Sequence, residues 1–201
     1  MTTPLNPQRR RGDDLETAVF AAAYQLLATE GYQAVTFSKI AVAANTSRSV
    51  LYRHWDTPFE LLFAAMHAQL ANADVQLPSF DFDDGSLRAN LLHSASEFSD
   101  LLASMLPEFN RMMITEMTAH SKAIQKLLAT MQLGNLEMID YALQLALQHG
   151  ELTRMPPETT RLALFQIIRY RSVIENHRLT ATDLTAIVDD VVLPAILKTG
   201  H

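Results

Sequence analysis

The 201-residue chain contains no cysteine, which excludes disulfides, thiolate metal sites and cysteine nucleophiles. Glycine and proline are scarce, at six and eight residues. Few stretches alternate between apolar and polar residues, so sheets are disfavoured and an all-α fold is expected. No apolar run reaches the roughly 20 residues that a membrane-spanning helix needs. No hydrophobic signal segment follows Met1. We therefore expect a cytoplasmic protein without a membrane partner.

Charged residues make up only 19% of the chain, and the net charge is −6. The negative excess is unevenly distributed. Residues 1–72 contain six Lys or Arg and six Asp or Glu, whereas residues 73–201 contain ten Lys or Arg and sixteen Asp or Glu. A phosphate backbone responds to the local field, because charges beyond about 10 Å are largely screened. The acidic total is therefore compatible with a nucleic-acid-binding region in the N-terminal third.

Apolar periodicity and helix-breaking residues divide the chain into an arm and two helical regions. The arm at 1–12 is polar and contains the run Arg9–Arg11, which is either a DNA-contacting extension or a solvated tail. The head at 13–73 and the body at 77–201 are joined by an acidic linker near 77–86. The helices expected in the head lie at 13–29, in a pair within 36–55, and at 57–73. Those expected in the body lie near 86–105, 107–119, 121–149, 157–177 and 181–197.

The stretch from Thr36 to Trp55 predicts two short helices around a sharp turn. Asn45 stands where the chain reverses, and asparagine tolerates the left-handed backbone conformation that most residues avoid. Thr46 or Ser47 can cap the second helix, which turns Val50 and Leu51 inward. The side chains left on its surface are Ser47, Arg48, Ser49, Tyr52, Arg53 and His54. Hydroxyl, guanidinium, phenol and imidazole groups on one helix face are suited to binding nucleic acid.

Two kinds of contact are expected on this surface. Arg48 and Ser49, at the helix start, are placed to reach base edges. Tyr52, His54 and Thr36 are assigned to phosphates, which position a protein on DNA without reading its sequence. His54 can equally be a capping or packing histidine. The complete predicted DNA-binding set is Thr36, Lys39, Ser47, Arg48, Ser49, Tyr52, Arg53 and His54.

These residues resemble the TetR family of bacterial transcriptional regulators. The pattern that carries the resemblance runs through the head without a gap and consists of Gly31-Tyr32, Thr36, Ile40-Ala41, Ser47–Trp55 and Glu60. It departs from the family at three points. Asn45 replaces the usual turn glycine, and Trp55 replaces the usual phenylalanine. Pro58 and Phe59 stand where a lysine usually precedes the acidic residue, which puts one phosphate contact in doubt.

The resemblance implies a homodimeric regulator, most commonly a repressor, whose recognition helix at about 47–54 enters a major groove. Its expected partners are double-stranded operator DNA with an inverted repeat, a second copy of the chain, and a small apolar effector that releases the DNA. The implied body, 77–201, is the ligand-binding and dimerisation domain. Two other classes remain: a helical ligand-binding or carrier protein without DNA binding, and a metal-dependent helical enzyme.

An apolar, sulfur-rich set in the body suits an adaptable ligand pocket, because methionine re-packs easily. The same residue types also fit an ordinary core. Arg169 lies inside an otherwise apolar helix, which makes it a candidate for a polar ligand contact, with an intersubunit salt bridge as the alternative. The predicted pocket residues are Phe98, Met105, Met112, Met113, Met117, Tyr141, Phe165 and Arg169.

The last two expected helices favour a dimer. The segment Leu162–Ile168 is apolar almost all round, so its helix must be covered on two sides. The same surface of a second subunit can supply one side in a two-fold four-helix interface. A central helix in a monomer is the alternative. The predicted interface residues are Leu162, Phe165, Leu184, Ile187, Val188, Val191 and Val192.

Signals for metal binding and catalysis are weak. His93 with Glu97, and Glu116 with His120, are i, i+4 pairs that could hold a metal if they faced each other, although such pairs are common on exposed helix faces. The sequence contains no nucleophile elbow, Gly-rich phosphate loop or metalloprotease motif. We therefore expect no cofactor, no metal and no catalytic residue.

Overall fold

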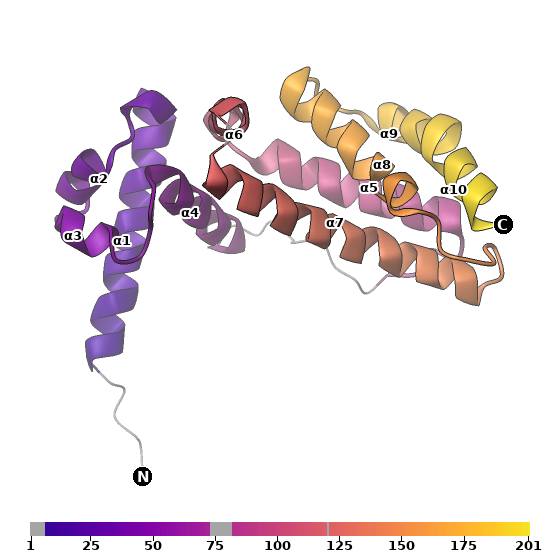
Figure 1. Cartoon of the computed structure of the whole chain (residues 1–201), viewed down its shortest axis with the longest axis horizontal. Helices are drawn as coiled ribbons and strands as arrows, with labels where there is room; N and C mark the ends of the chain where they lie inside the picture. The colour runs from indigo at the N-terminus through magenta and orange to yellow at the C-terminus, as the bar shows by residue number, and fades with distance from the viewer. Residues whose placement is uncertain (1–6, 73–81, 120) are drawn as a thin grey trace, which may run out of the picture. The chain divides into compact units, whose positions relative to one another are not determined.

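Within the described residues, the chain is entirely helical. The computed structural model describes residues 7–72, 82–119 and 121–201, with side chains for 14–69 and for the two later segments. These segments contain helices joined by turns and extended connections, with no β-strand among them (Figure 1). The predicted all-α class is confirmed. In this part of the chain, no helix is both long enough and apolar enough to cross a membrane.

The chain packs as two compact units, which we call the first unit and the second unit. The first unit comprises Met1–Asp74 and Leu106–Ala123, and the second comprises Val75–Met105 and Ile124–His201. The chain thus leaves the second unit, contributes one helix to the first, and returns. The sequence pattern assigns this helix to the body, whereas its packing assigns it to the first unit. The expected boundary between head and body falls outside the described residues.

The first unit is built from six helical elements. Their bounds are Pro7–Glu30 (α1), Tyr32–Ala34 (η1, a 3-10 helix), Phe37–Ala43 (α2), Arg48–Leu51 (α3), Pro58–Asn72 (α4) and Pro107–Ala119 (α6). α1 begins at Pro7 rather than at the expected Asp13, and proline suits the first helical position. The backbone of Arg9–Arg11 is therefore helical, and the expected arm at 1–12 overlaps the start of α1. The side chains of residues 7–13 lie outside the described residues.

An apolar core between α1 and α4 stabilises the first unit. Val19, Ala23 and Leu27 repeat every four residues along α1, and each is at most 1% exposed. Buried residues of the other helices complete this core: Ile40, Ala41, Leu51, Phe59, Leu61, Leu62, Ala65 and Met66. The Trp55 ring packs edge-on against Phe20, with 5.7 Å between ring centroids. Trp55 therefore fills the place of a large aromatic residue in the head.

The start of α4 is capped by Thr57 and Glu60 in an arrangement close to a capping box. Thr57 Oγ1 accepts a hydrogen bond of 3.2 Å from the Glu60 N–H. The Glu60 carboxylate in turn accepts a bond of 2.9 Å, but from the N–H of Asp56 rather than from that of Thr57. Two N–H groups at the helix start are thereby satisfied, as the pattern requires. This cap fixes the junction between the α2–α3 pair and α4.

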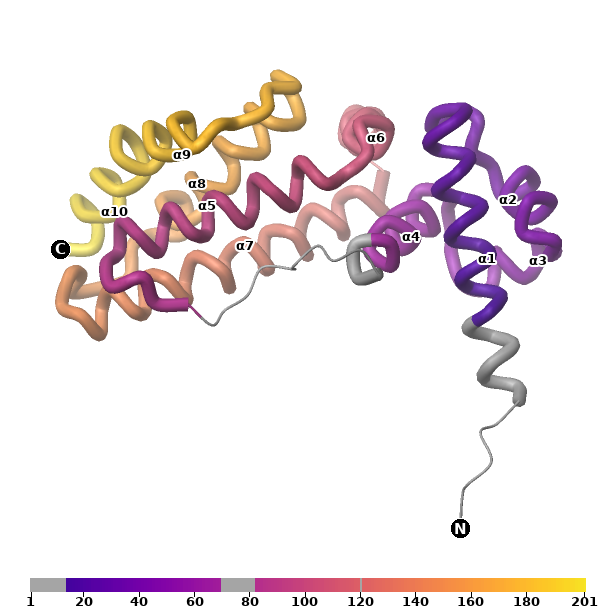
Figure 2. The backbone as a smooth tube through the Cα atoms, turned by 180° about the vertical axis from the view of Figure 1, so that it is seen from behind, coloured from indigo at the N-terminus to yellow at the C-terminus, as the bar shows by residue number. Residues whose placement is uncertain are grey.

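The second unit is a bundle in which the last segment of the chain packs on α5 and α8 (Figure 2). Its α-helices span Leu87–Ser104 (α5), Lys122–Gln148 (α7), Glu158–Arg169 (α8), Ala181–Ile187 (α9) and Leu193–Gly200 (α10). Two π-helical turns, Tyr170–Ile174 (η2) and Val188–Val192 (η3), follow α8 and α9. One continuous apolar cluster fills the space between these elements, with Leu143, Phe165 and Ile168 fully buried.

The π turn η3 adapts the last helical segment to its packing. The buried residues Leu184, Val188, Val192 and Ile196 repeat every four residues. This interval is longer than the 3.6-residue period of an α-helix. The wider π turn absorbs the difference and keeps all four side chains on the covered face. The sequence predicts the extent of this helix but gives no sign of the turn inside it.

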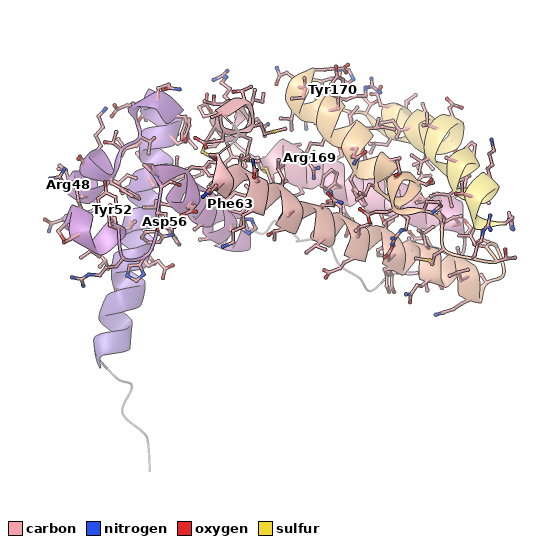
Figure 3. All side chains as sticks on the ribbon, in the orientation of Figure 1. Arg48, Tyr52, Asp56, Phe63, Arg169 and Tyr170 are labelled. Atoms are coloured by element: carbon pink, nitrogen blue, oxygen red, sulfur yellow. The ribbon has the colours of Figure 1, made fainter. Side chains whose placement is uncertain are left out.

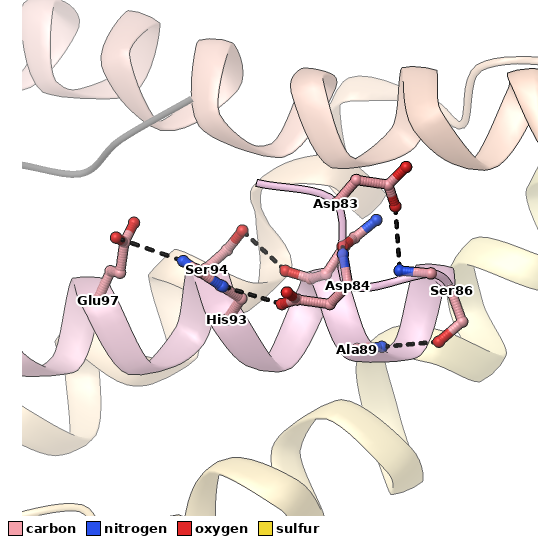
Figure 4. A network of polar contacts seen from close by, with 9 residues as sticks. Asp83, Asp84, Ser86, Ala89, His93, Ser94 and Glu97 are labelled. Carbon is pink, nitrogen blue, oxygen red and sulfur yellow. Dashed lines mark hydrogen bonds and ion pairs between the residues drawn. The ribbon is translucent and has the colours of Figure 1, made fainter. Parts of the chain in front are cut away.

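The residues directly before α5 are anchored to that helix (Figure 4). Asp84 Oδ2 lies 2.9 Å from His93 Nδ1, and Glu97 Oε1 lies 3.4 Å from His93 Nε2. Phe82 is buried and stacks on the His93 ring, with 4.2 Å between centroids. Residues 82–86 of the expected linker are therefore part of the second unit. The rest of that linker lies outside the described residues.

Candidate nucleic-acid interface

The turn between α2 and α3 is set by Asn45, whose φ of 48° is left-handed as predicted. The Asn45 N–H donates to the Val42 carbonyl at 3.2 Å, and the Thr46 N–H donates to the Ala41 carbonyl at 2.9 Å. Together these two bonds form a Schellman motif, which satisfies the last carbonyls of α2. Asparagine therefore ends α2 and redirects the chain into α3 without a glycine.

Helix α3 is short and is anchored by a buried leucine. It covers Arg48–Leu51, and the residues that follow continue in tighter turns, so the predicted recognition helix at 47–54 is only partly α-helical. Ser47 occupies the N-cap position, but its side chain makes no capping bond. Its Oγ lies instead 2.8 Å from Ser49 Oγ. Leu51 is fully buried, which fixes the face that α3 presents to solvent.

All eight residues of the predicted DNA-binding set are exposed on the first unit. Arg48 and Tyr52 project from the surface formed by α2 and α3 (Figure 3). Arg48 Nη1 lies 3.5 Å from Ser38 Oγ, which places this guanidinium beside the start of α2. The structure therefore leaves all eight side chains accessible, and their individual roles at DNA stay predictions.

Aromatic packing orients two members of this set. The Tyr52 ring lies edge-on against the buried Phe37, with 4.7 Å between centroids, while 61% of Tyr52 remains exposed. A ring held in this way presents its hydroxyl with little loss of side-chain entropy. The His54 ring lies 5.4 Å from that of Trp55. The packing role considered for His54 is thus present, and its phosphate contact is a prediction.

Thr36 and Lys39 both have partners within the chain. Thr36 is the N-cap of α2, and its Oγ1 accepts a bond of 3.3 Å from the Lys39 N–H. Lys39 Nζ lies 2.5 Å from Glu30 Oε2, and both side chains of this ion pair are about half exposed. Exposed ion pairs contribute little free energy. Lys39 can therefore exchange Glu30 for a phosphate at small cost.

The local charge of the interface is positive although the chain is acidic. Between Thr36 and Trp55 the sequence contains Lys39, Arg48 and Arg53 and no aspartate or glutamate. A local excess of cations on an exposed surface attracts a phosphate backbone whatever the net charge elsewhere. The α2–α3 surface thus combines positive charge, exposed hydrogen-bonding groups and a rigid apolar support.

Helix α6 adds a contact that the sequence pattern does not predict. The Tyr32 hydroxyl, on η1, donates a hydrogen bond to the carboxylate of Glu116 on α6. Burial and, second, this bond raise the pKa of Tyr32 well above its usual range, so the hydroxyl remains a donor. Phe63 and Phe109 also stack between α4 and α6, with 6.1 Å between centroids. No local pattern could pair Tyr32 with Glu116, because 84 positions separate them.

Two family models match the chain. Residues 19–65 match the model described as bacterial regulatory proteins of the tetR family, and residues 82–191 match a tetracyclin repressor-like C-terminal domain. The chain belongs to the TetR family. The predicted family, its fold and its function as a helix-turn-helix transcriptional regulator are confirmed. A carrier without DNA binding is not favoured.

Relatives of this TetR-family chain carry the same kind of description. A helix-turn-helix transcriptional regulator of Mycobacterium tuberculosis is 26% identical over 193 residues, which cover 91% of this chain and 88% of the relative. A DNA-binding transcriptional repressor TetR of Mycobacteroides abscessus is 33% identical over 82 residues, which cover 41% of each chain. The first relative aligns with both units and the second with less than half of the chain.

Solved structures of TetR regulators share the fold. A TetR regulator from Haloarcula marismortui superposes with a TM-score of 0.63 at 18% identity, covering 92% of this chain and 99% of its own. FadR of Bacillus subtilis, solved in complex with stearoyl-CoA, gives a TM-score of 0.55 at 18% identity, covering 89% of this chain and 96% of its own. At these identities the likeness concerns the fold alone.

The pocket residues predicted for this TetR-family chain do not form one cluster within a unit. Met112, Met113 and Met117 lie on α6 and belong to the first unit, where Met112 and Met113 are part of the core. The other five belong to the second unit. There Tyr141 packs against Phe82, with 5.1 Å between ring centroids. A methionine-rich composition could not show this division, because it depends on which unit accepts α6.

A smaller group of the predicted pocket residues does come together. Phe98 on α5 and Phe165 on α8 pack edge-on, with 4.9 Å between centroids. The Arg169 guanidinium lies over the Phe98 ring, with Cζ 5.2 Å from its centroid. Arg169 is therefore placed against the aromatic interior of the second unit, and its role in a ligand site stays a prediction.

A groove of about 340 Å³ lies in the first unit, between α1 and α4. Its lining residues are Glu16, Thr17, Phe20, Ala21, Ala65, Ala68 and Gln69. None of the predicted pocket residues lines it. The groove combines three alanines with Phe20 and the polar side chains of Glu16, Thr17 and Gln69.

Six of the seven residues predicted for the dimer interface are already buried within a single chain. Leu162, Phe165, Leu184, Ile187, Val188 and Val192 are between 0 and 7% exposed within a single chain. Side chains that already fill the core of their own protomer cannot cover a second one. Only Val191 is exposed, at 49%. The apolar stripe indicates a covered face, but it does not say whether the cover comes from the same chain.

The predicted i, i+4 pairs do not form a metal site among the described residues. His93 contacts both Asp84 and Glu97. Glu116 accepts hydrogen bonds from Tyr32 and from Ser121. No group of three or more His, Asp or Glu in the described part of the chain is arranged to hold a metal ion. His120 lies outside the described residues.

Proposed function

We propose that this TetR-family regulator is a homodimeric repressor that binds an inverted-repeat operator and releases it when the second unit binds a small apolar effector. The observation that carries the proposal is the α2–α3 surface, where eight exposed polar or basic residues lie above the buried Leu51. A two-fold dimer would place its recognition helices in major grooves about 34–36 Å apart or a multiple of that distance. The proposal assigns no catalytic step to the chain.

Within the interface we assign the base contacts to Arg48 and Ser49, because they open the recognition helix. Tyr52, His54 and Thr36 are assigned to phosphates, and Lys39 and Arg53 add positive charge. A bidentate arginine contact with guanine is worth about 1–3 kcal/mol of discrimination. Phosphate contacts position the protein and make binding depend steeply on salt.

For the dimer we propose an interface centred on exposed apolar side chains near the end of the chain. The large exposed apolar residues of the second unit include Tyr170, Ile174, Val191 and Leu197, which are between 37 and 55% exposed. All four lie in the π turns or in α10, and their exposure places them outside the protomer's own core. Isolated exposed apolar residues are ordinary, but a series along one terminal segment is typical of an interface.

Release by an effector requires a difference in affinity between two conformations. A ligand that favours the non-binding conformation by roughly 2.7 kcal/mol would lower operator affinity about a hundredfold. The FadR structure with stearoyl-CoA shows that a protein of similar fold accommodates an apolar acyl chain. This likeness supports an apolar effector here only by analogy of fold.

Selection from random duplex DNA tests the proposal. The full chain is expected to enrich an inverted repeat, and its affinity is expected to fall steeply as salt increases. Enrichment of no sequence, together with a flat dependence on salt, would favour the carrier protein instead. An enriched site without two-fold symmetry would contradict the dimer.

A further inference from the structure

Two arginines of the second unit provide a comparison. Arg88, on α5, is exposed and donates from Nε and Nη2 to the two carboxylate oxygens of Asp189, at 2.7 and 2.8 Å. These two nitrogens form the edge of a guanidinium that matches a carboxylate with two parallel hydrogen bonds. In Arg88, both nitrogens of this edge are therefore hydrogen-bonded to a carboxylate.

Arg169 has the same edge in the opposite environment. Its Nε and Nη2 atoms are both buried, and neither has a hydrogen-bond partner among the described residues. A buried N–H without a partner is costly, and a buried charge without a counter-charge is more so. Burial accordingly lowers the pKa of Arg169 from its usual value. The two unpartnered atoms are the pair that would bind a carboxylate.

The surroundings of Arg169 favour a ligand with an apolar body. The guanidinium lies over Phe98, and Phe98 packs against the fully buried Phe165. Arg169 is also the last residue of α8, directly before the π turn Tyr170–Ile174. π turns within helices occur often at functional sites. The helix end and the Phe98 ring favour a cation here, but neither supplies a hydrogen-bond acceptor to these two nitrogens.

Two other partners for this edge compete with a small acid. A carboxylate of a second subunit is the alternative raised by the sequence, and the burial of Nε and Nη2 does not separate it from a ligand, because either carboxylate would have to enter the interior of the protomer. Glu97 also has one buried carboxylate oxygen, Oε2, without a partner. Its other oxygen lies 3.4 Å from His93 Nε2, which holds this side chain in the network before α5.

We propose that Arg169 binds the carboxylate of the effector through Nε and Nη2, so that the effector is an organic acid with an apolar body. This assignment rests on the proposed effector function of the second unit and specifies its chemistry. The aromatic pair Phe98 and Phe165 would contact the apolar part of the acid next to its carboxylate. The acid would supply both the missing acceptor and the missing counter-charge.

The test compares acids with neutral molecules of the same shape. Straight-chain alkanoates from butanoate to dodecanoate and their primary amides are titrated into the full chain, and binding is measured by calorimetry and by thermal unfolding. At least one alkanoate is expected to bind about tenfold or more tightly than its amide, because hydrogen bonds to charged groups are the strong ones. If no alkanoate binds more tightly than its amide, the proposal is overturned.

Three variants test whether Arg169 causes the preference for an acid over its amide. Arg169→Met should abolish the preference for the acid. Arg169→Lys keeps the charge without the two-nitrogen edge and should retain only part of it. Arg88→Met, which loses the same edge at an exposed position, should bind like the parent. An acid preference that survives in Arg169→Met would also overturn the proposal.

The melting temperature of the ligand-free chain gives an independent test of the role of Arg169. Arg169→Met removes two unpartnered buried donors, so the ligand-free variant should melt at or above the temperature of the parent. A lower melting temperature with no acid preference in the parent would make Arg169 purely structural. Operator binding by the ligand-free chain distinguishes the proposed carboxylate site at Arg169 from the proposed repressor function. Loss of acid preference with intact operator binding refutes only the carboxylate site, whereas failure to bind any operator refutes the repressor.

Discussion

The first unit carries its functional polar groups on the surface, whereas the second unit hides polar groups inside. All eight predicted DNA contacts of the first unit are exposed. Among the described residues, the buried polar side chains Asn90, Ser94, Ser99 and Asn135 all belong to the second unit. The buried side-chain nitrogens and oxygens that lack a partner also lie there.

This difference follows from what each unit is proposed to bind. A DNA duplex is large and charged, so the groups that recognise it must lie on an accessible surface above an apolar core. A small effector is enclosed, so the groups that recognise it must lie inside and remain partly unsatisfied in its absence. Surface recognition is therefore visible as a pattern in the sequence, and interior recognition is not.

The largest effect is expected when the buried side chain of Leu51, which supports the α2–α3 surface, is shortened. Leu51→Ala deletes a fully buried side chain and should destabilise the first unit by about 2–5 kcal/mol. Urea unfolding can be followed by the fluorescence of Trp55, the single tryptophan, which packs in the first unit. The variant should also lose operator binding near its lowered midpoint.

Leu143→Ala is the matched control in the second unit, where Leu143 is equally buried. It should lower the stability of the second unit, measured by circular dichroism, by a similar amount. If the units unfold independently, the Trp55 transition should hardly move. An equal shift of that transition in both variants would show that the two units unfold as one and would break the comparison.

Substitutions at neighbouring positions can distinguish the proposed dimer surface from the core beneath it. Val191→Asp places a charge on an exposed position and should weaken dimerisation about a hundredfold or more, because an unpaired charge would be buried in the interface. Light scattering should then give the monomer mass for a chain with unchanged helix content. Val188→Asp should instead unfold the second unit, since Val188 is fully buried.

Leu133→Asp is the control for this experiment, because Leu133 is 62% exposed on α7 and lies outside the proposed interface. It should remain a dimer. If Val191→Asp elutes at the dimer mass, the terminal segment is not the interface and the exposed apolar residues need another explanation.

Arg48→Ala probes the recognition surface directly. The substitution should weaken operator binding by about 1–3 kcal/mol and relax base preference at one position of each half-site. Stability should hardly change, because Arg48 is exposed. Arg178→Ala, at an exposed position of the second unit, serves as the charge-matched control. Unchanged affinity in Arg48→Ala would remove this residue from the base-reading set.

The smallest effect is expected from Tyr32→Phe, which removes the hydroxyl that α6 binds through Glu116. The free energy of unfolding should fall by about 1 kcal/mol at neutral pH, which is typical of one hydrogen bond. Because the folded state raises the pKa of Tyr32 above its usual 10.0, the unfolded chain loses this proton first as pH rises. The contribution of Tyr32 is therefore complete below pH 10 and declines above it.

The direction of this pH dependence is tested by measuring the free energy of unfolding of the parent and of Tyr32→Phe from neutral to strongly alkaline pH. The difference between the parent and Tyr32→Phe should be constant below pH 10 and should shrink above it. A difference that grows with alkaline pH would mean that the ionised phenol is favoured in the folded chain, contrary to its contact with a carboxylate.

Features that depend on neighbours in the sequence could be predicted well. The left-handed turn at Asn45 rests on hydrogen bonds between residues a few positions apart. The exposed face of α3 follows from the helical period and from Leu51. The start of α1 is missed because Pro7 extends the helix beyond the apolar pattern.

Features that depend on distant residues could not be predicted in the same way. Six of the seven predicted dimer residues lie on faces that the same chain covers, and the segments that cover them are distant in sequence. The predicted methionine-rich set is divided between the two units because α6 joins the first unit. A hydrophobic pattern says that a face is covered and leaves open which partner covers it.

The sequence by itself determined the helices, the recognition surface and the family, because each depends on residue types at short, fixed spacings. Only the tertiary structure decided the place of α6, the covered face of the last helix and the state of each arginine. Arg88 finds Asp189 across 101 positions of sequence, while the same edge of Arg169 finds no partner among the described residues. Both are arginines on helices, and what separates them is the packing of distant segments around the guanidinium.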